Sequence, residues 1–278
     1  MQFTQGLHRA VQQQPDAIAT IHGARQQSFQ QLQSRVARLA GALQEQGFKK
    51  GDRIAILSLN SYRYLEAYPP IAWPGAVVNP INFRWCNAEA IYSLIDSHSV
   101  ALIVDDNFAP QAAEIKAGSP SLRCVFYNGE QTTPTDMLSC DALIDAAAPI
   151  PDAEAAGDDL LGVFYTGGTT GAPKGVMLSH ANVFSSGLAL LSENLFADHA
   201  VGLHAAPMFH LADMMVTISL LIRGGRHVFL SAFRPDSALT LTQQHGITDL
   251  LLVPAMLQKV VDFPALSEFN TSCVRYSS

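Results

Sequence analysis

The sequence is poor in cysteine, and its four cysteines stand far apart along 278 residues. None of them forms a CxxC pair or a zinc-finger spacing, which argues against a structural zinc site and against a disulfide framework. Reduced thiols in a cytoplasmic protein are therefore expected. Charged residues are also scarce, at 15%, and the formal net charge is −7. An acidic chain without a basic stripe is not expected to bind nucleic acid.

Long hydrophobic runs are missing as well. The N-terminal stretch MQFTQGLHRAVQQQ lacks the apolar core of a signal peptide. No run is long enough to span a bilayer, so no transmembrane segment is expected. The sequence does contain 48% hydrophobic residues, spread in short runs, which is a globular composition. The length allows one large α/β domain or two smaller ones.

Helical and strand-like patterns alternate along the chain. The clearest helix follows Ser28 and is expected to stop at Gly47, with Ser28 and Gln31 fitting a capping box. Its apolar residues recur every three or four positions and form one face: Phe29, Leu32, Val36, Leu39 and Leu43. Short apolar runs typical of covered strands occur in RIAILSL, ALIVDD, RCVFY, LLGVFYT, RHVFLS and TDLLLV. This alternation predicts an α/β fold with mostly parallel sheets flanked by helices.

Residues 131–159 are different in composition. They are rich in proline, alanine and acidic residues, as in QTTPTD and AAAPIPDAEAAGDD. This composition predicts an exposed connection, and a boundary between two sub-lobes is expected within it.

One loop concentrates glycine, threonine and a single lysine in FYTGGTTGAPKGVMLSH, residues 164–180. Its glycines are expected to allow positive φ and to bring backbone N–H groups close to a ligand: Gly167, Gly168, Gly171 and Gly175. Three hydroxyls and one cation suit a polyphosphate, whereas the alternative is a plain hairpin loop. The loop is not a Walker A motif, because Gly175 rather than Ser or Thr follows Lys174. A Rossmann fingerprint is also excluded, because the strand-like GVMLS follows Lys174 before a helix begins near Ser179.

The order of residues 165–175, YTGGTTGAPKG, closely resembles the phosphate-loop signature of the adenylate-forming superfamily. That superfamily includes acyl-CoA synthetases, luciferases and peptide-synthetase adenylation domains. GAVVNPINFRWCNAEAIYSLIDS and LHAAPMFHLADM resemble further segments of fatty-acyl-CoA and related synthetases, so the resemblance covers nearly the whole chain. It implies that residues 1–278 are a partial N-terminal AMP-binding domain. The family's magnesium-binding glutamate, ribose-binding aspartate and C-terminal domain have no counterpart in this sequence.

The resemblance also implies a reaction and its substrates. In the family, the loop holds the β- and γ-phosphates of ATP while a carboxylate oxygen attacks the α-phosphorus. The thiol of coenzyme A then attacks the acyl-adenylate. ATP, Mg²⁺, CoA and a carboxylic acid, with a fatty acid expected, are thus implied. Phosphate contacts are assigned to Thr166, Gly167, Gly168, Thr169, Thr170, Gly171 and Lys174.

His210, in PMFH, matches the family histidine beside the acyl carboxylate, whereas the alternative is a buried core histidine. Asp213 is expected either to orient His210 across one helical turn or to be an exposed carboxylate at a helix start. The pocket-wall candidates, for which burial alone is the alternative, are Met208, Phe209, Val253 and Pro254.

The expected function is an ATP-dependent carboxylic acid–CoA ligase of fatty acid metabolism, here as an incomplete fragment inactive alone. The alternative is a non-catalytic remnant that binds a nucleotide or a partner protein. The retained residues do not distinguish short, long and aromatic acids, and they leave the oligomeric state open.

Overall fold

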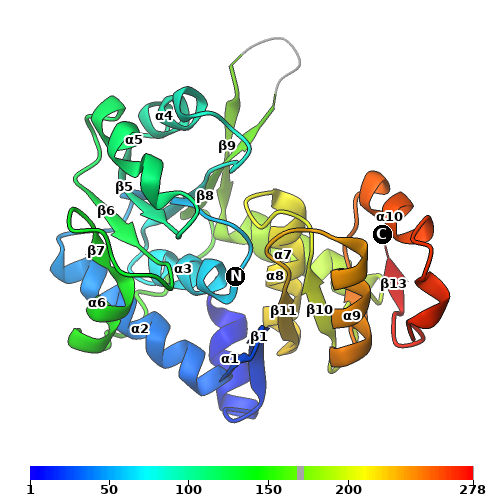
Figure 1. Cartoon of the computed structure of the whole chain (residues 1–278). Coiled ribbons are helices and arrows are strands. Elements are labelled where there is room, and N and C mark those ends of the chain that lie inside the picture. The colour runs from blue at the N-terminus through cyan, green and yellow to red at the C-terminus, as the bar shows by residue number, and fades with distance from the viewer. Residues whose placement is uncertain (168–171, 278) are drawn as a thin grey trace. The chain divides into compact units, whose positions relative to one another are not determined.

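The computed structural model describes residues 1–167 and 172–277, which form two compact units (Figure 1). The first unit consists of Met1–Thr4, Ser34–Leu59 and Arg63–Asn182, and the second of Gln5–Gln33, Asn60–Tyr62 and Val183–Ser278. Within the described ranges, no helix has the length and apolar character needed to cross a membrane.

The first unit is built on a seven-stranded sheet of order β7-β6-β5-β3-β4-β8-β9. Its neighbouring strands are parallel except for the pair β8–β9, which is antiparallel. The strands are β3 (Arg53–Leu57), β4 (Val77–Pro80), β5 (Ser99–Val104), β6 (Cys124–Tyr127), β7 (Leu138–Ser139), β8 (Leu160–Thr166) and β9 (Lys174–Ser179).

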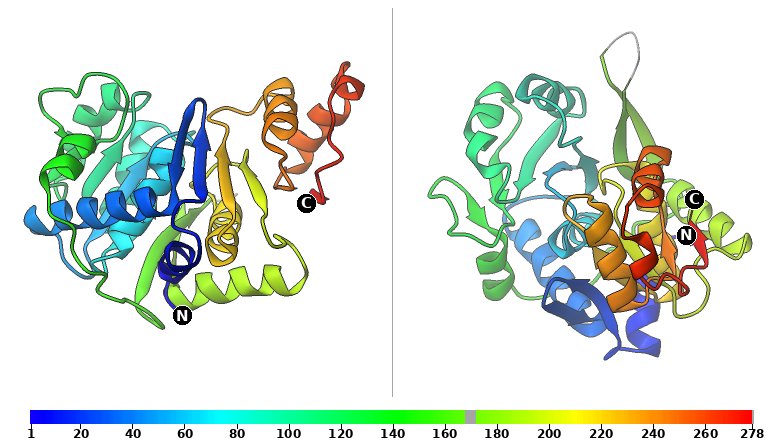
Figure 2. Two further views of the ribbon diagram at one scale, coloured as in Figure 1. Left: turned by 90° about the horizontal axis from the view of Figure 1, so that it is seen from below. Right: turned by 45° about the vertical axis from the view of Figure 1, so that its right-hand side comes forward.

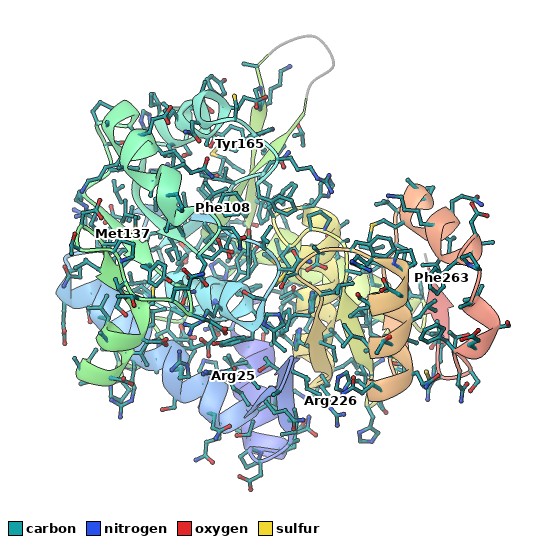
Figure 3. The ribbon with its side chains drawn as sticks, viewed as in Figure 1. Arg25, Phe108, Met137, Tyr165, Arg226 and Phe263 are labelled. Carbon is teal, nitrogen blue, oxygen red and sulfur yellow. The ribbon has the colours of Figure 1, made fainter. Side chains whose placement is uncertain are left out.

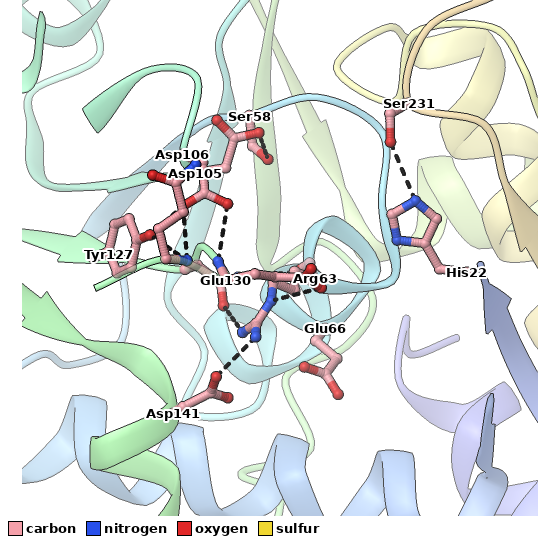
Figure 4. Close-up of polar contacts among 12 residues, drawn as sticks. His22, Ser58, Arg63, Glu66, Asp105, Asp106, Tyr127, Glu130, Asp141 and Ser231 are labelled. Carbon is pink, nitrogen blue, oxygen red and sulfur yellow. Dashed lines mark hydrogen bonds and ion pairs between the residues drawn. The ribbon is translucent and has the colours of Figure 1, made fainter. Parts of the chain in front are cut away.

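Two groups of helices accompany this sheet. An apolar cluster packs α4 (Asn87–Asp96) and α5 (Ala112–Gly118), with the short η1 (Ala109–Gln111), against β3 and β5. Ion pairs join α2 (Phe29–Glu45), α3 (Tyr62–Ala72) and α6 (Cys140–Ala146). In that network Arg35 lies 2.7 Å from both Glu66 and Asp141, and Figure 4 shows Arg63 reaching the same Asp141.

The helix expected after Ser28 is confirmed. It begins at Phe29, and the backbone N–H of Ser28 donates to Gln31 Oε1 at 2.8 Å. The backbone N–H of Gln31 donates to Ser28 Oγ at 3.2 Å, which completes the capping box. Gly47 has a φ of +81°, a left-handed conformation that favours glycine and ends the helix.

The second unit is built on a six-stranded sheet of order β13-β12-β10-β11-β1-β2 (Figure 2). The strands are parallel except for the hairpin β1–β2. They are β1 (Ile18–His22), β2 (Arg25–Ser28), β10 (Val201–His204), β11 (Arg226–Phe229), β12 (Asp249–Leu250) and β13 (Tyr276–Ser277). The further helices of the chain are α1 (Gln5–Gln13), α7 (His180–Ser192), α8 (Leu211–Arg223), α9 (Pro235–His245), α10 (Pro254–Val261) and η2 (Leu266–Glu268).

Helices α8 and α9 cover opposite faces of the second sheet. Leu203 belongs to the apolar cluster that includes Ala238 of α9. The preceding residue of β10, Gly202, faces Leu220 of α8, since a Cβ there would lie 2.5 Å from that side chain. Because successive strand residues point to opposite faces, the two helices sandwich β10.

Residues 131–159 differ from the exposed connection that was predicted. They contain β7 and α6, and Cys140 and Ile144 of α6 are buried. The amphipathic stretch LSCDALIDA was not recognised as a strand and helix because proline- and acid-rich segments lie on either side of it. The division between the two units does not fall within residues 131–159, because the first unit continues through them to Asn182.

Candidate functional site

The glycine–threonine loop is carried by an antiparallel ribbon, β8–β9, in the first unit. The last register pair of the ribbon is Thr166 opposite Lys174. Both residues are exposed, and so is Gly167, where a Cβ would meet no atom of the described residues within 4 Å. Gly168, Thr169, Thr170 and Gly171 lie outside the described residues. The structure therefore places a hydroxyl and an ammonium group across from each other where the loop leaves the ribbon.

Tyr165, which is labelled in Figure 3, connects the loop end of β8 to α4. Its hydroxyl donates to Asp96 Oδ2 at 2.6 Å and lies 3.2 Å from the carbonyl oxygen of Ser93. Its ring contacts Trp85 edge-on, with 6.1 Å between centroids. Burial, followed by the hydrogen bond to Asp96, raises the pKa of Tyr165, so the phenol remains a neutral donor.

The two described glycines of the loop, Gly167 and Gly175, do not adopt the positive φ that glycine allows. Gly175 instead makes room for packing, because a Cβ there would lie 2.8 Å from Val163 Cγ1 and 3.0 Å from Tyr165 Cζ. Tyr165 and Gly175 are directly opposite each other in the ribbon. The glycine is therefore explained by the tyrosine ring across from it.

His210 is the N-cap residue of α8 in the second unit, with φ −87° and ψ 141°. Its Nδ1 accepts from the backbone N–H of Ala212 at 3.4 Å. When the ring accepts at Nδ1, the proton is on Nε2. The side chain is exposed, so the alternative of a buried core histidine is wrong. The imidazole can thus offer a donor to an oxygen of a bound ligand.

The residues before His210 are core residues. Met208 is fully buried and Phe209 is 9% exposed. Neither lines the apolar cavity described below.

Asp213 does neither of the two things expected of it. Its side chain is fully buried, and Oδ2 lies 2.7 Å from His204 Nδ1 rather than at His210. His204 Nε2 in turn lies 2.9 Å from Nδ1 of His227, which is also fully buried. Burial, and then the neighbouring His204, hold the pKa of His227 well below its usual value, so His227 is neutral. A buried Asp–His–His chain therefore lies beneath the start of α8.

An apolar cavity of about 210 Å³ opens next to the first turns of α8. Its lining comes from α7, α8, β12 and the residues that follow them: Leu190, Leu195, Phe196, Ala212, Met215, Val216, Asp249, Leu250 and Leu251. Val253 and Pro254 do not line it and are exposed at the start of α10. Met215 and Val216 could not be singled out from the sequence, because α8 is apolar on most of its circumference.

No metal centre is found in the described ranges: no three His, Cys, Asp or Glu side chains there are arranged to hold an ion.

Known proteins similar to this chain give a consistent result. The family described as AMP-binding enzyme matches residues 7–277. A feruloyl-CoA synthase from Amycolatopsis sp is 35% identical over 268 residues, covering 96% of this chain and 52% of that protein. The long-chain-fatty-acid–CoA ligase FadD13 of Mycobacterium tuberculosis is 31% identical, covering 90% and 48%.

Solved structures agree with this. The inhibitor-bound N-terminal domain of FACL13 from Mycobacterium tuberculosis has a TM-score of 0.89 at 26% identity, covering 99% of this chain and 69% of that one. ATP-bound MatB from Rhodopseudomonas palustris has a TM-score of 0.86 at 27% identity, covering 100% and 54%. The chain spans about half the length of the curated relatives it matches. It belongs to the AMP-binding enzyme family.

Proposed function

We propose that this chain supplies the ATP-phosphate loop and part of the acid site of an AMP-forming carboxylic acid–CoA ligase. The observation that carries this proposal is the pair Thr166–Lys174 at the mouth of the loop. The pair belongs to the sequence signature of residues 165–175 and provides a hydroxyl and an ammonium group. Next to it, Gly167 leaves space for a ligand among the described residues. Relatives named as CoA ligases support the same reaction.

Lys174 suits a phosphate ligand because no carboxylate of the described residues pairs with it. Among the described residues it has no ion-pair partner, and its side chain is exposed. The negative charges of a triphosphate would pair with the ammonium group of this lysine. Charge-assisted hydrogen bonds of this kind contribute about 1.5–3 kcal/mol each. We assign the β- and γ-phosphates to Thr166, Gly167 and Lys174, together with Gly168, Thr169, Thr170 and Gly171, which lie outside the described residues.

His210 is proposed to meet the carboxylate of the acid. Capping of α8 leaves its Nε2–H as the free donor, and the side chain is exposed. A carboxylate oxygen that must attack phosphorus needs to be held by a hydrogen-bond donor, and the imidazole N–H of His210 provides one.

The acyl chain is proposed to be apolar. The cavity beside Ala212 and Met215 begins within two residues of His210 along α8. Its lining is aliphatic and aromatic apart from Asp249. Fatty and aryl acids both fit this chemistry.

The reaction so proposed has two steps. A carboxylate oxygen of the acid attacks the α-phosphorus of ATP, which forms an acyl-adenylate and releases pyrophosphate. The thiolate of CoA then attacks the acyl carbonyl, which forms the thioester and releases AMP. Bound Mg²⁺ would supply further neutralisation of the phosphate charge, and we assign it no ligand in this chain. The part of the protein described here acts by positioning and charge neutralisation.

The loop assignment is tested with the 278-residue chain and inorganic tripolyphosphate in a calorimetric titration. Lys174→Ala should weaken binding by about tenfold or more, because it removes one charge-assisted contact. Lys259→Ala, which removes an exposed lysine on α10, is the matched control and should bind like the wild type. Equal affinity of the Lys174 variant and the wild type would refute the assignment.

A second assay tests whether the chain catalyses the first step alone. The 278-residue protein should show no carboxylate-dependent exchange between ATP and pyrophosphate, because no adenine or ribose contact is assigned to it. Exchange that Lys174→Ala abolishes would overturn this expectation.

A further inference from the structure

The segment that leads to His210 is held by one side chain, Asn60. The Nδ2 group of Asn60 donates to the carbonyl oxygen of His204 at 3.0 Å and to that of Ala206 at 2.7 Å. Its Oδ1 accepts from the backbone N–H of Met208 at 2.8 Å. One amide thus engages three alternate residues between the end of β10 and the start of α8.

Two of these bonds go to backbone groups in the segment between β10 and α8, the Ala206 carbonyl and the Met208 N–H, whereas the His204 carbonyl also accepts from the backbone N–H of Leu230 at 3.3 Å. Residues 205–209 lie between β10 and α8, and Ala205, Ala206, Met208 and Phe209 are buried there. Buried backbone groups without a hydrogen bond cost free energy, so something must bond them. Asn60 is 3% exposed, and its amide provides two donors and one acceptor at the required spacing.

Asn60 is itself fixed from the other side. Ser231 Oγ donates to the backbone carbonyl of Asn60 at 2.9 Å. The same oxygen lies 3.2 Å from His22 Nε2, a contact that Figure 4 shows. At the start of the segment, the His204 ring is fixed by Asp213 and His227. The segment therefore has a rigid support along its length.

We propose that Asn60 is a positioning residue that sets the direction of the His210 imidazole through the backbone of residues 204–208. Asn60 acts through the main chain and has no contact with substrate. Its role in the reaction rests on the proposed function of His210 as the partner of the carboxylate. The positioning itself is a property of the chain and can be measured without turnover.

The test uses Asn60→Asp in the 278-residue chain. Aspartate keeps the shape and the acceptor for Met208 but replaces the two N–H donors with an oxygen facing two carbonyl oxygens. Amide hydrogen exchange in residues 205–210 should accelerate by about tenfold or more, with the rest of the second unit unchanged. The ¹⁵N resonances of the His210 ring should also move toward a tautomer mixture.

Asn79→Asp is the matched control. Asn79 is fully buried, and its Nδ2 donates to the side chains of Ser97 and Ser99 in the first unit. This variant tests the general effect of a buried carboxyl and should leave the His210 ring signals as in the wild type. If Asn60→Asp does not fold, Asn60→Ala removes both donors and also the acceptor for Met208 without adding a charge, and the same measurements apply.

The outcomes separate the proposal from the function it rests on. Unchanged His210 signals in a folded Asn60 variant would overturn the positioning role. Titration with octanoate should shift the His210 ring of the wild type and shift it less in the Asn60 variant. A ring that moves in the variant but does not respond to octanoate in the wild type would leave the positioning role standing and refute the carboxylate assignment.

Discussion

The buried pair Asp213–His204 should behave as a strongly coupled unit. Both side chains are fully buried and joined at 2.7 Å, and Asp213 Oδ1 already has no hydrogen-bond partner among the described residues. His204→Leu therefore leaves a buried carboxyl with no partner at all. We expect this change to lower the free energy of unfolding by about 3–5 kcal/mol, the cost of breaking a buried pair from one side.

The same contacts predict the other two variants of a double-mutant cycle. Asp213→Leu leaves the Nδ1–H of His204 without an acceptor and should cost about 1–3 kcal/mol. The double variant removes both groups and replaces them with apolar side chains, so it should cost less than the two single changes added together. The coupling free energy should be about 2 kcal/mol or more. The contact of His204 with His227 is lost in both His204 variants and cancels from this value.

The assay is urea unfolding followed by far-ultraviolet circular dichroism, because α8 contributes to that signal. Both tryptophans, Trp73 and Trp85, lie in the first unit, so their fluorescence reports on the other part of the chain. If the losses in unfolding free energy of the two single variants sum to that of the double variant within about 0.5 kcal/mol, the reasoning is refuted, since independent sites behave in that way.

Three further changes test the packing and the protonation of the second unit. Thr217→Val should raise the free energy of unfolding by about 1 kcal/mol, because the buried hydroxyl has no partner among the described residues; a lower urea midpoint would contradict this. Gly6→Ala should lower it by about 1–3 kcal/mol, because the Cβ would lie 2.6 Å from the carbonyl group of Leu221 across α1 and α8; an unchanged midpoint would contradict this overlap. Burial, and then His204, hold the pKa of His227 below its usual value, so its contribution is complete above about pH 6.5 and is lost as the pH falls. His227→Leu should therefore flatten the fall in urea midpoint between about pH 6.5 and 5, and an unchanged slope would contradict this.

Local patterns were enough to predict much of the fold. The capping box of α2 and the apolar strands of both sheets depend on residues close together in sequence, and the structure confirms them. The hairpin β1–β2 was missed because β2, with the sequence RQQS, has no apolar alternation. Its strand conformation comes from pairing with β1, and β1 pairs in turn with β11, which lies far along the chain. Tertiary pairing of this kind overrides local propensity.

The same distinction separates what was predicted at the site from what was not. The order of residues in the loop, and PMFH around His210, are local and could be read directly. Asn60 and His204 are separated by 144 positions, and no spacing rule joins an asparagine to a backbone carbonyl so far away. Asp213 was linked to His210 because a local rule pairs residues that lie one helical turn apart. Its partner in the structure is instead His204, at the end of β10. A sequence pattern can thus identify the group that meets a ligand, but the groups that orient it are brought together only by the fold.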